Sequence, residues 1–171
     1  MSELQQVLDE LVVECTESLF ESIGLSITHV ATTKDPCELV GIIGFAGSKL
    51  RGVVGLSMSP QLAVRAVGNA TEGETPVDDW VAEAANQLLG RIKNRLLQKG
   101  VAISAALPIV LRGIEVRLAP RSSQPVRVYS FSDKDESAVV WLDLQTAGEI
   151  AVAETVDAAE QPMDEGDLML F

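Results

Sequence analysis

The chain has 171 residues, 47% of them hydrophobic, which is enough to bury the core of one domain of ordinary size. Its formal net charge of −12 argues against a nucleic-acid-binding protein, because such binding depends on lysine and arginine side chains that neutralise phosphates. No apolar run approaches the ~18 residues of a membrane span, and the N-terminal residues lack the pattern of a signal peptide, so we expect a cytoplasmic protein without a membrane partner.

The first predicted element is a helix over about residues 3–22. Ser2 and Gln5 have the spacing of a capping box, and Gly24 suits a helix end. Apolar residues recur at helical spacing and predict a face that packs on a core: Leu4, Val7, Leu8, Leu11, Val12, Cys15, Leu19 and Phe20. Neither Cys15 nor Cys37 fits a disulfide framework, so we interpret both as reduced thiols.

Strand-like runs follow at residues 26–31, 38–46 and 50–58, and Gly47-Ser48 predicts a hairpin between the last two. Ser59 before Pro60 is typical of a helix start, and Gly68 indicates an end near Val67. After a long helix at 77–99, further strands are predicted at 102–112, 113–119, 126–132 and 138–145. Short connections between neighbouring strands predict an α/β (α+β) fold, with a largely antiparallel sheet and long helices packed on one face.

The acidic residues are concentrated at the C-terminal end. Residues 146–171 contain seven acidic residues and no lysine or arginine, and large apolar residues are sparse between Glu154 and Glu165. The sequence therefore predicts one domain over residues 1–145 and a poorly ordered acidic tail over 146–171. Whether residues 149–153 add a short strand, and whether the apolar residues 168–171 fold back or dock on a partner, stays open.

The helix predicted at residues 77–99 carries the residues that bear on function. Asp78 and Asp79 suit its positive N-terminal end, and Gly100 suits its C-terminal cap. At ~100° per residue, one side forms a core face: Val81, Ala84, Ala85, Leu88, Leu89, Ile92 and Leu96. The opposite side carries the polar residues and a glycine: Asp79, Glu83, Asn86, Gly90 and Lys93.

Two interpretations of that opposite side are open. Polar residues opposite a core stripe are the rule for a solvated helix face. Gly90 favours a function, because a glycine inside an exposed helix costs ~1 kcal/mol relative to alanine. Such a residue usually serves close packing or a close approach by another molecule.

The pattern Glu83-x-x-Asn86-x-x-x-Gly90-x-x-Lys93 resembles the helix motif of the CheX and CheC type chemotaxis phosphatases. Residues 52–68 and 103–113 resemble the segments that flank this helix in the family, the second with a proline ahead of a glycine. The resemblance covers residues 1 to about 145 and implies a phosphatase acting on the phosphoaspartate of a CheY-like response regulator.

The resemblance also implies a role for each residue of the motif. Asn86 would insert beside the phosphoaspartate and orient the attacking water, and Glu83 would contact the active-site lysine of the regulator. Asp79, Gly90 and Lys93, on the same face, are expected to contact the partner. The protein would need no cofactor of its own, because the Mg²⁺ ion would belong to the regulator.

Two further expectations come from the same resemblance. The protein is expected to form a homodimer, since CheX-like proteins pair through their sheets. In CheC-like relatives the first helix can carry a second motif, but here Glu17 stands where the amide would be, three residues after Glu14. A carboxylate cannot donate the hydrogen bond that an amide donates. We therefore expect a single active face per chain.

A second function class stays open: a CheX-like module that binds or sequesters a regulator, or serves in a flagellar switch assembly, without hydrolysis. Other chemistry has little support in the sequence. His29, the only histidine, lies in a predicted strand, which favours a structural role over a zinc ligand. Glycine-rich phosphate-loop motifs are absent from the sequence, and Trp80 and Trp141 are interpreted as core or interface residues.

Overall fold

The computed structural model describes residues 3–32, 38–70, 76–113, 125–133, 136–148 and 150–152. The helices and strands have the following bounds: α1 (Glu3–Glu21), β1 (Thr28–Val30), β2 (Leu39–Ala46), β3 (Leu50–Met58), α2 (Pro60–Ala70), α3 (Val77–Gln98), β4 (Ser104–Ala105), β5 (Ile109–Arg112), β6 (Arg127–Asp133) and β7 (Glu136–Thr146). Within these ranges, no helix is both long enough and apolar enough to cross a membrane.

The strands form one sheet, and every strand pairing in the described ranges is antiparallel. This sheet has seven strands there, in the order β1–β6–β7–β3–β2, with β4 and β5 one after the other along the outer edge of β2. The predicted hairpin at Gly47 is confirmed, since its N–H donates to the Leu50 carbonyl oxygen at 2.6 Å. The predicted antiparallel α+β fold is therefore confirmed.

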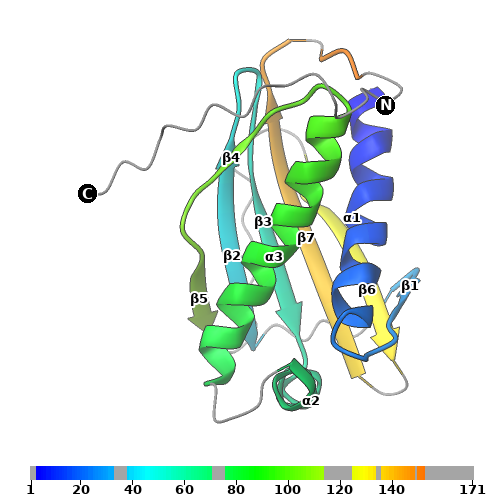
Figure 1. The fold of residues 1–171 in the computed structure, drawn as a ribbon, viewed down its shortest axis with the longest axis vertical. Helices are drawn as coiled ribbons and strands as arrows, with labels where there is room; N and C mark the ends of the chain where they lie inside the picture. Colours follow the sequence, from blue (N-terminus) through cyan, green and yellow to red (C-terminus); the bar gives the residue numbers. More distant parts are fainter. Residues whose placement is uncertain are drawn as a thin grey trace.

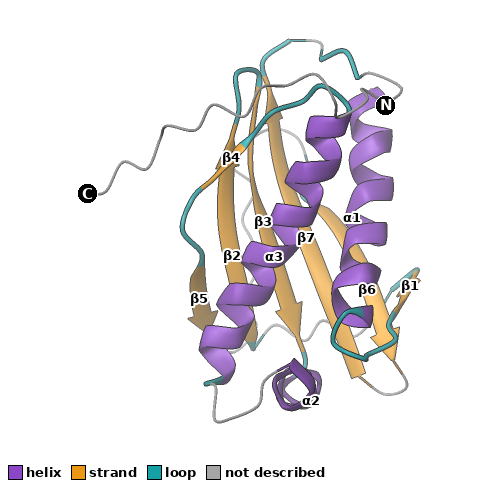
Figure 2. Cartoon of the chain, viewed as in Figure 1, coloured by secondary structure: helices purple, strands orange, loops and turns teal. Residues whose placement is uncertain are grey.

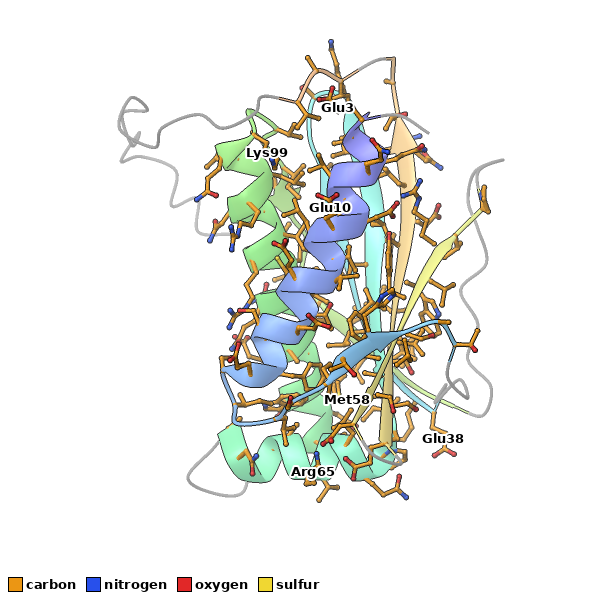
Figure 3. All side chains as sticks on the ribbon, turned by 90° about the vertical axis from the view of Figure 1, so that its right-hand side faces the viewer. Glu3, Glu10, Glu38, Met58, Arg65 and Lys99 are labelled. Atoms are coloured by element: carbon orange, nitrogen blue, oxygen red, sulfur yellow. The ribbon has the colours of Figure 1, made fainter. Side chains whose placement is uncertain are left out.

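The helices form a second layer. Helices α1 and α3 lie side by side across one face of the sheet, and α2 lies across its end (Figure 1, Figure 2). Seen from the side, the start of α1 at Glu3 and Lys99, just after α3, lie at the same end of the molecule, so the two helices are antiparallel (Figure 3). The core lies between this layer and the sheet.

Helix α3 buries the face that the sequence predicts. All seven predicted core positions are buried, and Trp80 joins them with a relative exposure of 7%. The helix ends where Gly100 adopts a φ of 76°, a left-handed conformation that glycine reaches without a steric cost. Because this face is committed to the core, the opposite face of α3 points away from the sheet.

A glycine in β2 allows α3 to lie close to the sheet. A Cβ atom on Gly41 would be 2.7 Å from the carbonyl oxygen of Val81 and 3.0 Å from the Cβ of Ala85, both in α3. A real Cβ atom does not approach backbone so closely, so any side chain here would displace the helix. Gly41 therefore has a clear packing role under α3.

Polar contacts fix α3 against its neighbours. At its start, Asp78 forms an ion pair with Arg112 of β5 at 2.5 Å. In its second half, the Arg91 guanidinium donates to the hydroxyls of Ser18 and Ser22, in and just after α1, at 3.0 and 3.1 Å. These contacts lie on the flanks of α3, so they set the rotation of the helix and leave its outer face free of them.

Helix α1 is anchored to the sheet through Asp9. The Tyr129 hydroxyl and the Arg127 guanidinium of β6 both donate to the Asp9 carboxylate, and Arg127 also donates to the Gln5 carbonyl oxygen at 3.0 Å. Burial, together with the Asp9 carboxylate, raises the pKa of Tyr129 far above its usual value. The phenol therefore stays protonated and keeps this hydrogen bond.

The prediction of one continuous strand over 102–112 is wrong, because the structure has two short strands there, β4 and β5, with a break between them. Ala105 lies opposite Phe45 and Ile109 lies opposite Ile42, so three residues on this edge face only two on β2. The extra residue makes a β-bulge at Leu107-Pro108, where proline has no N–H to donate to the sheet. This irregularity separates β4 from β5.

Two other element bounds differ from the prediction. Helix α2 continues through Gly68 to Ala70 instead of ending near Val67, although its predicted start is confirmed by the Ser59 hydroxyl, which accepts from the Leu62 N–H at 3.3 Å. Strand β1 is shorter than predicted. Cys37, most of the strand predicted at 113–119 and the tail beyond residue 152 lie outside the described residues.

Candidate functional site

The candidate site is the outer face of α3, which we call the amide ridge: Asp79, Glu83, Asn86, Gly90 and Lys93. Four of these residues are exposed, and Gly90 is partly buried. All five come from one helix, so their mutual spacing follows from helix geometry alone. The structure therefore brings together every residue that the sequence predicts for the site.

Glu83 has a hydrogen-bond partner that sequence reasoning missed. The Nε2 amide of Gln87 donates to Oε1 of Glu83 at 3.0 Å. The i, i+4 spacing of the two residues was the available signal, because side chains four apart on a helix are neighbours. The second carboxylate oxygen, Oε2, carries no hydrogen bond within the described part of the chain.

Asn86 presents its side chain to solvent one helical turn after Glu83. In the ranges that the structure describes, no hydrogen bond or ion pair engages the Asn86 amide. An amide offers both a donor NH₂ group and an acceptor oxygen. Asn86 can therefore donate to one group and accept from another at the same time.

Gly90 lies beside open space. A Cβ atom built on it would meet nothing within 4 Å, whereas the same test at Gly41 finds a backbone contact. No described element of the same chain therefore requires a glycine at this position. Packing within the described part of the chain is thereby excluded as its reason.

The charges along α3 change sign on either side of Asn86. Asp78, Asp79 and Glu83 precede it, and the next charged residues after it are Arg91, Lys93 and Arg95. This order matches the helix macrodipole, which favours acids near the N-terminus and bases near the C-terminus. The ridge therefore presents a negative half and a positive half to a partner.

The corresponding positions on α1 have another role. Glu14 is exposed, but the Glu17 carboxylate accepts a hydrogen bond from the backbone N–H of His29 at 2.9 Å, which ties α1 to β1. The His29 ring packs against Phe131 with ring centroids 5.6 Å apart, which agrees with the structural role inferred from the sequence. Glu17 thus serves the fold.

Other reactive groups do not form a second centre within the described residues. No group of three or more histidine, cysteine or acidic side chains gathers there at metal-binding distance. Burial raises the pKa of the Cys15 thiol, which keeps it protonated and unreactive. Trp80 and Trp141 are both buried, as predicted for core residues.

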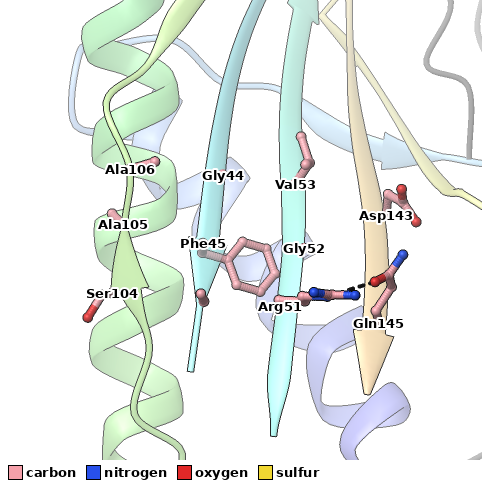
Figure 4. Close-up of a pocket in the computed structure, with 11 residues that line it drawn as sticks. Gly44, Phe45, Arg51, Gly52, Val53, Ser104, Ala105, Ala106, Asp143 and Gln145 are labelled. Atoms are coloured by element: carbon pink, nitrogen blue, oxygen red, sulfur yellow. Dashed lines mark hydrogen bonds between the residues drawn. The ribbon is translucent and has the colours of Figure 1, made fainter. Parts of the chain in front are cut away.

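A cavity lies away from the ridge. It has a volume of about 580 Å³, and its lining includes polar side chains of β3 and β7 together with Phe45 of β2 and Ser104 of β4 (Figure 4). In its wall, Arg51 of β3 donates from Nε to the side-chain oxygen of Gln145 on the neighbouring strand β7 at 2.8 Å. None of the ridge residues lines this cavity. The ridge is a convex surface, which suits recognition of a protein better than enclosure of a small ligand.

A comparison with protein families shows which family the chain belongs to. The family model described as "Chemotaxis phosphatase CheX" matches residues 39–132, which is more than half of the chain and includes the whole of α3. The chain belongs to the CheX family. The resemblance inferred from the Glu83 and Asn86 pattern is thereby confirmed at the level of the family. Among curated proteins, none matches the sequence.

Solved structures of CheX and CheC-like proteins share the fold. The chain is similar to chemotaxis protein CheX from Vibrio vulnificus, with 20% identity, a TM-score of 0.73, and coverage of 81% of this chain and 96% of that one. A CheC-like superfamily protein from Shewanella sp. PV-4 gives 21% identity, a TM-score of 0.70, and coverage of 81% and 97%.

A third structure is described as a CheX–CheY–BeF₃–Mg²⁺ complex from Borrelia burgdorferi. It has 16% identity and a TM-score of 0.60, and the alignment covers 80% of this chain and 96% of that one. Because all three identities are below 25%, these solved structures show that the chain shares their fold, and no more than that.

Proposed function

We propose that this CheX family protein is a phosphatase that hydrolyses the phosphoaspartate of a CheY-like response regulator. The observation that carries the proposal is an exposed carboxylate, Glu83, and an exposed amide, Asn86, one turn apart on α3. Two further observations support it: the family match, and a similar protein described in complex with CheY.

Asn86 has the chemistry that hydrolysis of an acyl phosphate requires. In the reaction, water attacks phosphorus while the bond from phosphorus to the aspartate oxygen breaks. The electron pair leaves with the carboxylate, and the released phosphate carries away the oxygen and protons of the water. Because an acyl phosphate is already reactive, the catalyst mainly has to place the water in line. The Asn86 oxygen accepts a hydrogen bond from the water, and its NH₂ group donates one to a phosphoryl oxygen.

Glu83 is assigned to docking in this proposal. Its carboxylate accepts a charge-assisted hydrogen bond from the active-site lysine of the regulator, which places the neighbouring Asn86 beside the phosphate. Asp79, Gly90 and Lys93 form the surrounding contact surface. The Mg²⁺ ion that balances the phosphate charge would be held by the regulator, so the proposal assigns no metal ligand to this chain.

The test follows phosphate release from a phosphorylated CheY-type receiver domain. We expect the wild-type protein to accelerate release, and Asn86→Ala to lose activity on the order of 100-fold at saturating receiver, because the lost function is positioning. Thermal melting should not change, since an exposed helix position tolerates alanine. Asn94→Ala, another exposed asparagine on α3, is the matched control and should retain activity.

Two outcomes would contradict the proposal. If Asn86→Ala hydrolyses the phosphoaspartate at the wild-type rate, the amide has been assigned wrongly. If the wild-type protein binds the receiver but leaves its dephosphorylation rate unchanged or slower, the protein is the non-catalytic binding module that the sequence left open.

A further inference from the structure

Gln87 lies beside the amide ridge on α3 but is not part of the pattern that resembles the family motif. Gln87 follows Asn86 directly, but its side chain points ~100° away around the helix. It is exposed, and its Nε2 amide donates to Oε1 of Glu83 at 3.0 Å. Its contact is therefore with the docking carboxylate and not with the catalytic amide.

This hydrogen bond restricts a side chain that is otherwise free. An exposed glutamate has several accessible rotamers, and fixing one of them in a complex costs conformational entropy. A glutamate side chain that is already held in one rotamer before docking loses less entropy when the complex forms. With Oε1 occupied by Gln87, Oε2 is the oxygen left to accept from an incoming donor.

The neutrality of the Gln87 amide matters for the same contact. A lysine at this position would form an i, i+4 ion pair with Glu83 and cancel its charge. An amide leaves the carboxylate negative, so it still attracts a cation by a charge-assisted hydrogen bond. Glutamine thus orients Glu83 without competing with a cationic partner.

We propose that Gln87 is a positioning residue that pre-orients the Glu83 carboxylate for a cationic group of the docking protein, the active-site lysine of a CheY-like receiver. The inference rests on the proposed function for the identity of that cation. Gln87 itself does not touch the phosphoryl group. Its effect is on docking, and turnover at saturating receiver is independent of it.

The experiment compares charge-changing variants in binding and in turnover. The binding probe is a CheY-type receiver saturated with beryllofluoride and Mg²⁺, and turnover is followed by phosphate release. We expect Gln87→Lys to weaken binding roughly fivefold at low salt, because the new ammonium group pairs with Glu83 and repels the receiver lysine. KM should rise with kcat unchanged, and the loss should shrink at high salt.

Matched variants test whether Gln87 affects binding through its contact with Glu83. Asn94→Lys adds the same charge to an exposed position of α3 about three turns, roughly 16 Å, beyond Glu83. It should bind within about twofold of wild type, because two exposed charges that far apart in water interact much more weakly than an i, i+4 pair. In a Glu83→Ala background, Gln87→Lys should cause a clearly smaller loss, because the Glu83 carboxylate that the lysine neutralises is gone and only its repulsion of the receiver lysine remains. Gln87→Ala should weaken binding by only about twofold, as an exposed i, i+4 contact predicts.

Several results would overturn the inference. A fall in kcat for Gln87→Lys would place Gln87 in the chemical step, and an undiminished loss in the Glu83→Ala background would mean that it contacts the receiver directly. Unchanged binding in Gln87→Lys would remove its role. If wild-type protein binds the receiver but releases no phosphate, the proposed phosphatase fails while the binding comparison still decides the role of Gln87. No binding by the wild type overturns both.

Discussion

Gly90 is a residue of α3 whose identity no contact within the described part of the chain explains. The buried side chains of this helix pack in the core, and Asp78 and Arg91 contact β5 and α1, but no atom within 4 Å of a Cβ at position 90 explains a glycine there. A glycine at a helix interior costs ~1 kcal/mol relative to alanine. We interpret that cost as the consequence of a surface that another protein approaches closely.

Gly90→Leu is expected to melt no earlier than wild type and to lose most phosphatase activity. Leucine is a better helix former than glycine, so the fold should not suffer. Its side chain would hold the receiver away from Asn86, and a misplacement of ~1 Å can cost a catalytic site on the order of 100-fold. Thermal melts and receiver titrations measure the two effects separately.

Gly90→Ala is the matched variant, because it tests helix stability with little added volume. A lower melting temperature in Gly90→Leu, or a broken dimer, would instead mean that the position packs against this protein or its dimer mate. A stable and fully active Gly90→Leu would leave the glycine without any of these roles.

At the scale of elements, the site depends on α3 alone, and Gly41 allows this dependence to be tested. A Cβ on Gly41 would lie 2.7 Å from the Val81 carbonyl oxygen, so Gly41→Ala must move α3 away from β2. We expect this overpacking to destabilise the protein by about 1–3 kcal/mol. Below the melting temperature activity should persist, because a helix that moves as a unit keeps the spacing of Glu83 and Asn86.

The control for Gly41→Ala is Gly68→Ala in α2, where an added Cβ meets nothing within 4 Å. That variant should unfold no earlier than wild type. Denaturant unfolding and phosphate release at a temperature where both variants are folded provide the measurements. A large loss of activity in folded Gly41→Ala would show that receiver docking also uses the sheet or β5, whose position relative to α3 would have changed.

Elements with a local signal were predictable, and those that depend on pairing were not. The face and bounds of α3 follow from apolar spacing and from Gly100, and the β2–β3 hairpin follows from Gly47. Pro108 was a local signal for the break between β4 and β5, but the exact register depends on how residues 106–108 fit against β2. The Glu83 and Asn86 pair was predictable because both lie on one helix, whereas the Gln87 contact required side-chain positions.

At the scale of the whole molecule, the order of strands could not be predicted from periodicity. The sheet places β3 between β2 and β7, which are far apart in the sequence, and such long-range pairings leave no trace in local spacing. The short connections between predicted strands indicated an antiparallel sheet, and the family resemblance agreed with it, but neither indicated the order of the strands. The division between a domain over 1–145 and an acidic tail stays a prediction, since β7 reaches Thr146 and residues beyond 152 lie outside the described ranges.

The outer edge of the sheet leads to the last prediction, that the protein forms a homodimer. On this edge, Ile109 and Leu111 of β5 have relative exposures of 55% and 41%, and Leu107 in the adjoining bulge reaches 88%. Exposed apolar side chains on an edge strand favour pairing with another strand. The bulge and Pro108 confine regular pairing to β5, so a second copy would continue the sheet there.

We expect sedimentation at micromolar concentration to show a dimer for the wild type and a monomer for Ile109→Lys, because a lysine on an edge strand opposes edge-to-edge pairing. Val64→Lys, at an exposed valine of α2 with a relative exposure of 62%, adds the same charge away from this edge and should remain dimeric. A wild-type monomer would remove the prediction. Monomeric Ile109→Lys should still dephosphorylate the receiver, because every residue of the amide ridge lies on α3 of a single chain. If activity is instead lost when the dimer dissociates, the dimer mate contributes to docking of the receiver.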